Sequence, residues 1–167
     1  MKIIFKNKIV LTVAILAVLA AGYAVFFPKA KVLAPTGLEY KNAEYGFVFP
    51  LPESWKGYSV VLLEWKGYLV GAEGDTPAEH GPQIMIRHPQ WTAAVPRQDI
   101  PIMVFTVTQW NSLQQEKFYV SAAPFGPREL GRNSKYVFAL PPRYNYAFPE
   151  GYQEVDEIML GNPLRPF

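Results

Sequence analysis

The feature that most constrains this chain is an uncharged, largely apolar run of 19 residues, Ile9 to Phe27. A helix of that length would be about 28 Å long, close to the roughly 30 Å hydrocarbon thickness of a bilayer. Pro28 is expected to end the helix, because it has no amide hydrogen and disfavours a helical conformation at the preceding residue. The sequence therefore predicts a membrane-spanning segment at residues 9–27.

Basic residues set the expected orientation of this segment. Lys2, Lys6 and Lys8 precede the apolar run, so residues 1–8 are expected to be cytoplasmic. The rest of the chain is then periplasmic or extracellular. The expected location is the cell membrane, with a single pass.

A cleaved signal peptide is the alternative to a retained anchor. Gly22, Tyr23 and Ala24 have the small-residue spacing that signal peptidase recognises, which would place cleavage after Ala24. The apolar run is longer than the 7–15 residues typical of a signal-peptide core, however, and it continues past Ala24. The sequence therefore favours a signal-anchor.

The charge of the chain is divided unevenly. Residues 1–31 contain five of the 16 basic residues and none of the 14 acidic ones. Residues 32–167 therefore carry 11 basic and 14 acidic residues, a formal net charge of −3. A domain without a basic surplus is not expected to bind nucleic acid. The absence of cysteine excludes disulfides and thiol chemistry.

The remaining chain reads as a stalk at residues 28–39 and one α+β domain at residues 40–167. Its pattern predicts an antiparallel sheet of about six strands with two or three helices packed on it. The predicted strands are residues 45–49, 58–65, 68–70, 83–87, 102–107, 117–122 and 135–140. Lys66-Gly67 is expected to make a hairpin turn, and residues 71–82 an exposed loop.

Two segments have helical spacing of apolar residues. The first is residues 108–117, with Thr108 as the predicted N-terminal cap. The second is residues 152–160, in which Val155, Ile158 and Met159 share one face and Gly161 ends the helix. The run at residues 102–107 is the most β-prone of the chain and is predicted to be a central strand.

Residues 45–55, which read Tyr-Gly-Phe-Val-Phe-Pro-Leu-Pro-Glu-Ser-Trp, resemble the opening of PsbP-like domains. The predicted order of a central strand, a helix, a hairpin and a final helix is also similar to that family. The resemblance implies an α/β/α sandwich over about residues 40–167. PsbP-like proteins share no catalytic residues and act as accessory or assembly proteins beside membrane complexes, so the implied role is binding.

The histidines are the residues most suited to metal or acid–base chemistry. His80 and His88, with Asp75 in the loop between residues 71 and 82, are candidate metal ligands. The alternative function is thus a small extracytoplasmic hydrolase or metal-binding enzyme that uses residues 71–88. Two observations speak against it: the spacing of these residues matches no ligand pattern, and no serine lies in a nucleophile elbow. No cofactor is expected.

Aromatic residues and arginines gather in irregular, proline-containing segments. Tyr, Trp and Arg carry much of the binding energy of protein interfaces, and rigid loops present them at low entropic cost. The candidate binding residues are Arg143, Tyr144, Tyr146, Trp91 and Arg97. The favoured function is a membrane-anchored, non-catalytic domain that binds a protein or envelope partner. A structural or assembly subunit of a membrane complex is a further alternative.

Overall fold

The computed structural model describes residues 37–71 and 77–167. The predicted cytoplasmic end, the membrane anchor, the cleavage site after Ala24 and most of the stalk lie outside these residues, as does Asp75. Within the described ranges no helix has the length and apolar character needed to cross a bilayer. The described part is an α+β domain, as the sequence predicts.

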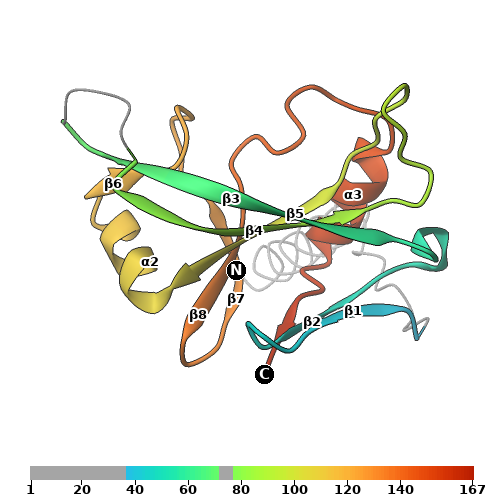
Figure 1. The fold of residues 1–167 in the computed structure, drawn as a ribbon, viewed down its shortest axis with the longest axis horizontal. Coiled ribbons are helices and arrows are strands. Elements are labelled where there is room, and N and C mark those ends of the chain that lie inside the picture. Colours follow the sequence, from blue (N-terminus) through green and yellow to red (C-terminus); the bar gives the residue numbers. More distant parts are fainter. Residues whose placement is uncertain (1–36, 72–76) are drawn as a thin grey trace, which may run out of the picture. The chain divides into compact units, whose positions relative to one another are not determined.

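The larger of its two sheets is antiparallel, has six strands and curls into a half-barrel (Figure 1). The strand order is β6-β3-β4-β5-β8-β7. The strands are β3 (Ser59–Leu69), β4 (Glu79–Arg87), β5 (Ile100–Thr106), β6 (Phe118–Tyr119), β7 (Arg128–Arg132) and β8 (Tyr136–Leu140). Successive side chains of a strand point to opposite faces of the sheet. A strand in a sheet that is covered on both faces therefore contributes side chains to two separate cores.

Strand β5 contributes side chains to both cores. Ile102 and Val104 enter one cluster of buried residues, whereas Met103 and Phe105 enter the other. β5 pairs with β4 on one side and β8 on the other, and six of its seven residues are buried. A continuous apolar run is what a strand covered on both faces requires. The predicted central strand is therefore confirmed.

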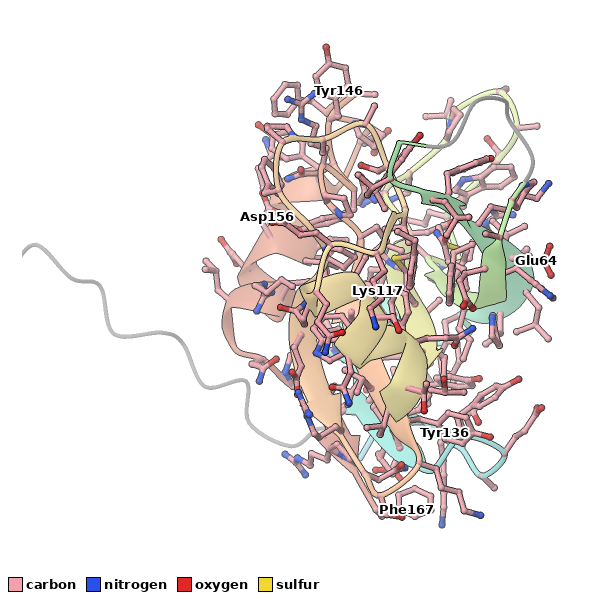
Figure 2. All side chains as sticks on the ribbon, turned by 90° about the vertical axis from the view of Figure 1, so that its left-hand side faces the viewer. Glu64, Lys117, Tyr136, Tyr146, Asp156 and Phe167 are labelled. Atoms are coloured by element: carbon pink, nitrogen blue, oxygen red, sulfur yellow. The ribbon has the colours of Figure 1, made fainter. Side chains whose placement is uncertain are left out.

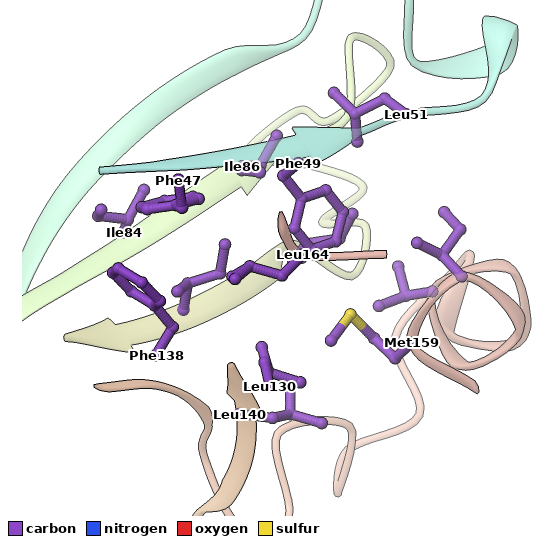
Figure 3. Close-up of a cluster of buried hydrophobic side chains, with 14 of the residues drawn as sticks. Phe47, Phe49, Leu51, Ile84, Ile86, Leu130, Phe138, Leu140, Met159 and Leu164 are labelled. Carbon is purple, nitrogen blue, oxygen red and sulfur yellow. The ribbon is translucent and has the colours of Figure 1, made fainter. Parts of the chain in front are cut away.

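The first core lies between one face of this sheet and a smaller antiparallel sheet. That sheet has the order β1-β2-β9, with β1 (Glu39–Asn42), β2 (Phe47–Pro50) and β9 (Arg165–Pro166). Phe47 and Phe49 of β2 extend into the cluster, where they meet side chains from β4 and β8 (Figure 3). The helix α3 (Tyr152–Leu160) contributes Met159, and the short helix η1 (Glu53–Trp55) contributes Trp55.

The second core covers the opposite face and is smaller. Trp110 and Leu113 of α2 (Val107–Gln114) pack there with Phe105 and Trp65. The indole nitrogen of Trp65 donates a hydrogen bond to the carbonyl oxygen of Val104 at 2.8 Å. The polar atom of this large side chain is therefore satisfied inside the core.

The predicted hairpin turn at Lys66-Gly67 is wrong. β3 continues through both residues, and β4 begins at Glu79, inside the segment predicted to be a loop. A side chain at Gly67 would meet the ring of Phe118 at 2.6 Å, so glycine is needed there for close packing and not for a turn. The predicted strand at 117–122 is also too long, because only Phe118–Tyr119 pair with β3.

The helix after β5 begins earlier than predicted. Thr106 caps α2: its side chain accepts a hydrogen bond from the amide of Gln109 at 3.1 Å. The side chain of Gln109 in turn accepts from the amide of Thr106 at 3.0 Å, which completes a capping box. Thr108, the predicted cap, is an exposed residue inside the helix.

Replacement of Thr106 by Ala is expected to lower the free energy of unfolding by about 1 kcal/mol, because the amide of Gln109 loses the hydroxyl oxygen that caps it. Thr108→Ala is the matched control, with an expected change within about 0.5 kcal/mol. Urea unfolding of both variants measures the difference. An equal loss in the two variants would contradict the observed cap.

Candidate functional site

The loop at residues 141–151 joins β8 to α3 and contains three of the five predicted binding residues. Tyr146 and Phe148 are 72% and 66% exposed, although both side chains are large and apolar. Figure 2 shows Tyr146 at the end of the molecule, pointing away from the body of the domain. Two exposed aromatic rings two residues apart are a candidate contact surface.

Tyr144 has a different place from the one predicted. It is half-buried against the first core, and its hydroxyl donates a short hydrogen bond to Asp156 of α3. The amide nitrogen of Asn145 also donates to Asp156, at 2.9 and 3.0 Å to its two carboxylate oxygens. Burial, together with the nearby carboxylate, raises the pKa of Tyr144 well above its ordinary value. Tyr144 therefore fastens the loop to α3.

Arg97 fastens the other end of the loop. Its guanidinium group is largely buried and pairs with the carboxylate of Glu150, and it lies 4.0 Å from that of Glu154. The amide of Gln98 donates to the carbonyl oxygen of Glu150 at 2.8 Å, so backbone and side chains join the same two segments. Arg97 therefore holds the segment before β5 against the end of the loop, and its guanidinium group is not free to bind a partner.

The backbone of the loop is folded into consecutive turns. The amide of Tyr146 donates to the carbonyl of Arg143 at 3.0 Å, and that of Phe148 to the carbonyl of Asn145 at 2.9 Å. Arg143 and Phe148 have positive φ angles of 54° and 47°, a conformation that non-glycine residues keep only when their surroundings hold it. The exposed rings are thus displayed on a fixed backbone.

Neighbouring groups also limit the motion of the exposed side chains. The guanidinium carbon of Arg143 lies 5.8 Å from the centre of the Tyr146 ring, which is a cation–π distance. The Phe148 ring packs edge to face against Tyr152 of α3, with 5.2 Å between the ring centres. The surface named the aromatic loop below consists of Arg143, Tyr146 and Phe148.

Trp91, the remaining predicted binding residue, is half-buried outside this loop. The guanidinium group of Arg87 stacks over its ring at 3.9 Å. The same group forms an ion pair with the buried carboxylate of Asp99 at 2.8 Å. Trp91 therefore covers a structural ion pair, and we do not include it in the aromatic loop.

The two histidines lie at opposite ends of β4. They are eight positions apart along an extended segment, which is roughly 26 Å. The exposed His80 lies 2.7 Å from a carboxylate oxygen of Glu64, whereas His88 is buried beside Trp55. A metal site that uses both histidines is not formed. No group of three or more His, Cys, Asp or Glu within residues 37–71 and 77–167 is placed to hold a metal ion.

His88, Ser54 and Glu154 come together, as the members of a hydrolase triad would, but their hydrogen bonds differ. The Ser54 hydroxyl donates directly to a Glu154 carboxylate oxygen at 2.6 Å. The Nδ1 atom of His88 accepts from the amide of Gln90 at 3.1 Å, and a further hydrogen bond joins the ring to the backbone of Ser54. Both hydrogen bonds of the ring are with backbone groups, so this histidine has the hydrogen bonds of a structural residue.

Burial, with a further contribution from the charge of Arg97, lowers the pKa of His88 below its ordinary value of 6.5. The unfolded chain therefore binds a proton more readily than the folded one. Stability from this group is full above about pH 6.5 and is lost as the pH falls towards the lower pKa of the folded state. In urea unfolding at a series of pH values, His88→Asn should lose less stability on acidification than the parent chain. Equal losses of stability in the variant and the parent chain would contradict a contribution of His88 to the pH dependence.

An open hollow of about 430 Å³ lies elsewhere, where the loop at residues 120–127 faces the end of α2. Its lining includes Phe118, Val120, Phe125 and Pro142. A second hollow of about 310 Å³ shares Val120 and Pro142 with it. Phe125 is more than half exposed, and its surroundings offer no acid–base pair.

The chain matches no family model, no curated protein and no solved structure. Its function is therefore inferred from the placement of its own residues. Among the residues that the sequence singles out, Arg143 and Tyr146 lie together on an exposed surface, and Phe148 joins them. The burial of Tyr144 could not be foreseen, because its partner Asp156 is 12 residues away on another element.

Proposed function

We propose that this chain is a membrane-anchored, extracytoplasmic binding domain that engages a protein or envelope partner through the aromatic loop, without catalysis. One observation carries the proposal: Tyr146 and Phe148 are largely exposed on a loop that is fastened at both ends. Aromatic side chains lose few rotamers on binding and bury a large area, so they are the usual anchors of protein interfaces.

The rigidity of the loop supports a binding role. Association is weakened by the entropy lost when a mobile loop becomes ordered. Here the contacts of Tyr144 and Asn145 with Asp156, and the ion pair of Arg97 with Glu150, already order the loop in the free domain. The exposed rings can therefore contact a partner without an additional entropic cost for ordering the loop.

The alternative of a hydrolase or metal-dependent enzyme has less support. His88 is buried and both hydrogen bonds of its ring are with backbone groups, whereas His80 lies at the far end of the same strand. The alternative of an assembly subunit remains compatible with a binding surface. It differs in the part of the chain that captures the partner, because an assembly subunit would dock through the anchor and not through residues 32–167.

The anchor and the relation to PsbP-like domains are parts of this proposal. The 19-residue uncharged run supports the anchor. The motif shared with PsbP-like domains forms β2 and η1, where Phe47, Phe49 and Trp55 are buried in the first core. α2 covers one face of the six-stranded sheet, and α3 packs on the other face beside the smaller sheet. A helix on each face is compatible with an α/β/α sandwich, whereas the three-stranded sheet is a departure from it.

Photo-cross-linking of the full chain in its native membrane tests the proposal. A photoreactive phenylalanine analogue replaces Tyr146 in one variant and Leu160, which is 79% exposed at the end of α3, in the control. We expect a discrete adduct with one partner from position 146 and none from position 160. The absence of an adduct at position 146, or the same adducts from both positions, would count against the aromatic loop.

A further inference from the structure

The outer edge of β3 is open over most of its length. β6 pairs only with Tyr68 and Leu69, at one end of the strand. Across residues 37–71 and 77–167, no strand pairs with the outer edge of residues 59–66, which are bonded to β4 on their other side. In Figure 1 β3 runs along the border of the six-stranded sheet. The backbone groups of alternate residues along this eight-residue stretch are thus available for another strand.

This open edge is also apolar. Val60, Leu62 and Leu63 are 37%, 68% and 52% exposed. Edge strands are normally protected from pairing by prolines, bulges or central charged side chains. Residues 59–63 contain no proline or charge, and their pairing with β4 is continuous from Ser59 to Gly67. The strand has the features of a surface that is covered by another strand.

We propose that the occupant is a second copy of this chain, paired antiparallel through β3 across a twofold axis at Leu62. Such an interface is isologous, so each residue must suit its own symmetry mate. Leu62 then faces Leu62 of the second copy, and Val61 faces Leu63. The exposed apolar side chains of both strands thereby gather at the centre of the interface.

The charged residues select this register. With the axis at Leu62, Glu64 lies opposite Val60 and Lys66 lies opposite Tyr58, so no like charges are adjacent. An axis at Leu63 would bring the two copies of Glu64 to diagonal positions on one face, where side chains still interact.

The proposed pairing would join two six-stranded sheets into one continuous sheet. It uses β3, whereas the aromatic loop lies between β8 and α3, so the pairing does not depend on the proposed function. Each domain would display its own aromatic loop. A dimer would therefore present two copies of the same contact surface to a partner.

Disulfide cross-linking tests the pairing directly, because the chain has no cysteine of its own. Leu62→Cys is introduced into the full chain in membranes, with Leu160→Cys as an equally exposed control. Directly opposite residues of antiparallel strands have Cα atoms about 4.5–5.5 Å apart, within the range that a disulfide spans. We expect Leu62→Cys to convert almost entirely to covalent dimer under mild oxidation, and Leu160→Cys to remain monomeric.

A second variant tests whether the dimer forms through pairing of β3 or through contacts of the membrane anchor. In the Leu62→Cys background, Val60→Glu places a carboxylate directly opposite Glu64 of the second copy, twice by symmetry, and should abolish the cross-link because like charges opposite each other are destabilising. The melting temperature should change little, because Val60 is on the surface. Cross-linking of Leu62→Cys no stronger than that of Leu160→Cys would overturn the proposal. So would a cross-link that survives Val60→Glu, since it would come from another contact.

Discussion

Replacement of Phe138 by Ala is expected to lower the free energy of unfolding by about 3–5 kcal/mol. Phe138 is fully buried in β8, and its ring centre lies 4.8 Å from that of Phe47 in β2. It therefore joins the six-stranded sheet to the smaller sheet that covers the first core (Figure 3). Loss of the ring removes buried apolar area and leaves a cavity that packed neighbours fill only in part.

Phe148→Ala is the control for this change. It removes the same atoms from a side chain that is mostly exposed, so the expected change is within about 0.5 kcal/mol. Urea unfolding of the detergent-solubilised chain, followed by tryptophan fluorescence, measures both variants. Since domains are stable by only about 5–15 kcal/mol, Phe138→Ala should shift the midpoint strongly. Similar midpoints for the two variants would contradict the observed core.

The second large effect is expected on binding. Tyr146→Ala with Phe148→Ala should weaken the capture of the partner by roughly 30-fold or more, which corresponds to about 2 kcal/mol, the usual threshold for an interface hot spot. Both rings are exposed, so the fold should be unaffected. Leu160→Ala removes an equally exposed apolar side chain from α3 and should leave binding unchanged.

The sequence predicts the elements whose pattern is local. The apolar run of β5 indicates a buried strand because nearly every residue of it is covered by one of the two cores. The spacing of Val155, Ile158 and Met159 indicates α3, and all three are buried in the structure. In these segments the burial required by the fold can be read from neighbouring residues alone.

The sequence pattern does not predict the elements that depend on partners far away in the chain. β1 has polar residues and alternates only between exposed and partly exposed positions, and it is a strand because it pairs with β2. β9 has two residues and pairs with β2 from the other end of the chain. Gly67 suggests a turn by its residue type, yet the ring of Phe118, 51 positions later, requires a glycine inside a strand.

The same distinction holds for the candidate site. Composition identifies the segment at residues 143–148, because Arg and Tyr are concentrated there. It does not show which rings face outward, since that depends on Asp156 holding Tyr144 and on Glu150 holding Arg97. Sequence reasoning consequently places Tyr144 and Arg97 among the contact residues, whereas in the structure they support Tyr146 and Phe148.

The most direct test of the proposed function is the affinity of the cross-linked partner for the full chain and for the Tyr146→Ala, Phe148→Ala variant. The full chain is reconstituted in vesicles, and binding of the purified partner is titrated at one ionic strength. The proposal predicts a dissociation constant roughly 30-fold or more higher for the double variant, and an unchanged one for Leu160→Ala. Equal affinities of the full chain and the double variant, with both folded, would contradict the aromatic loop as the binding surface.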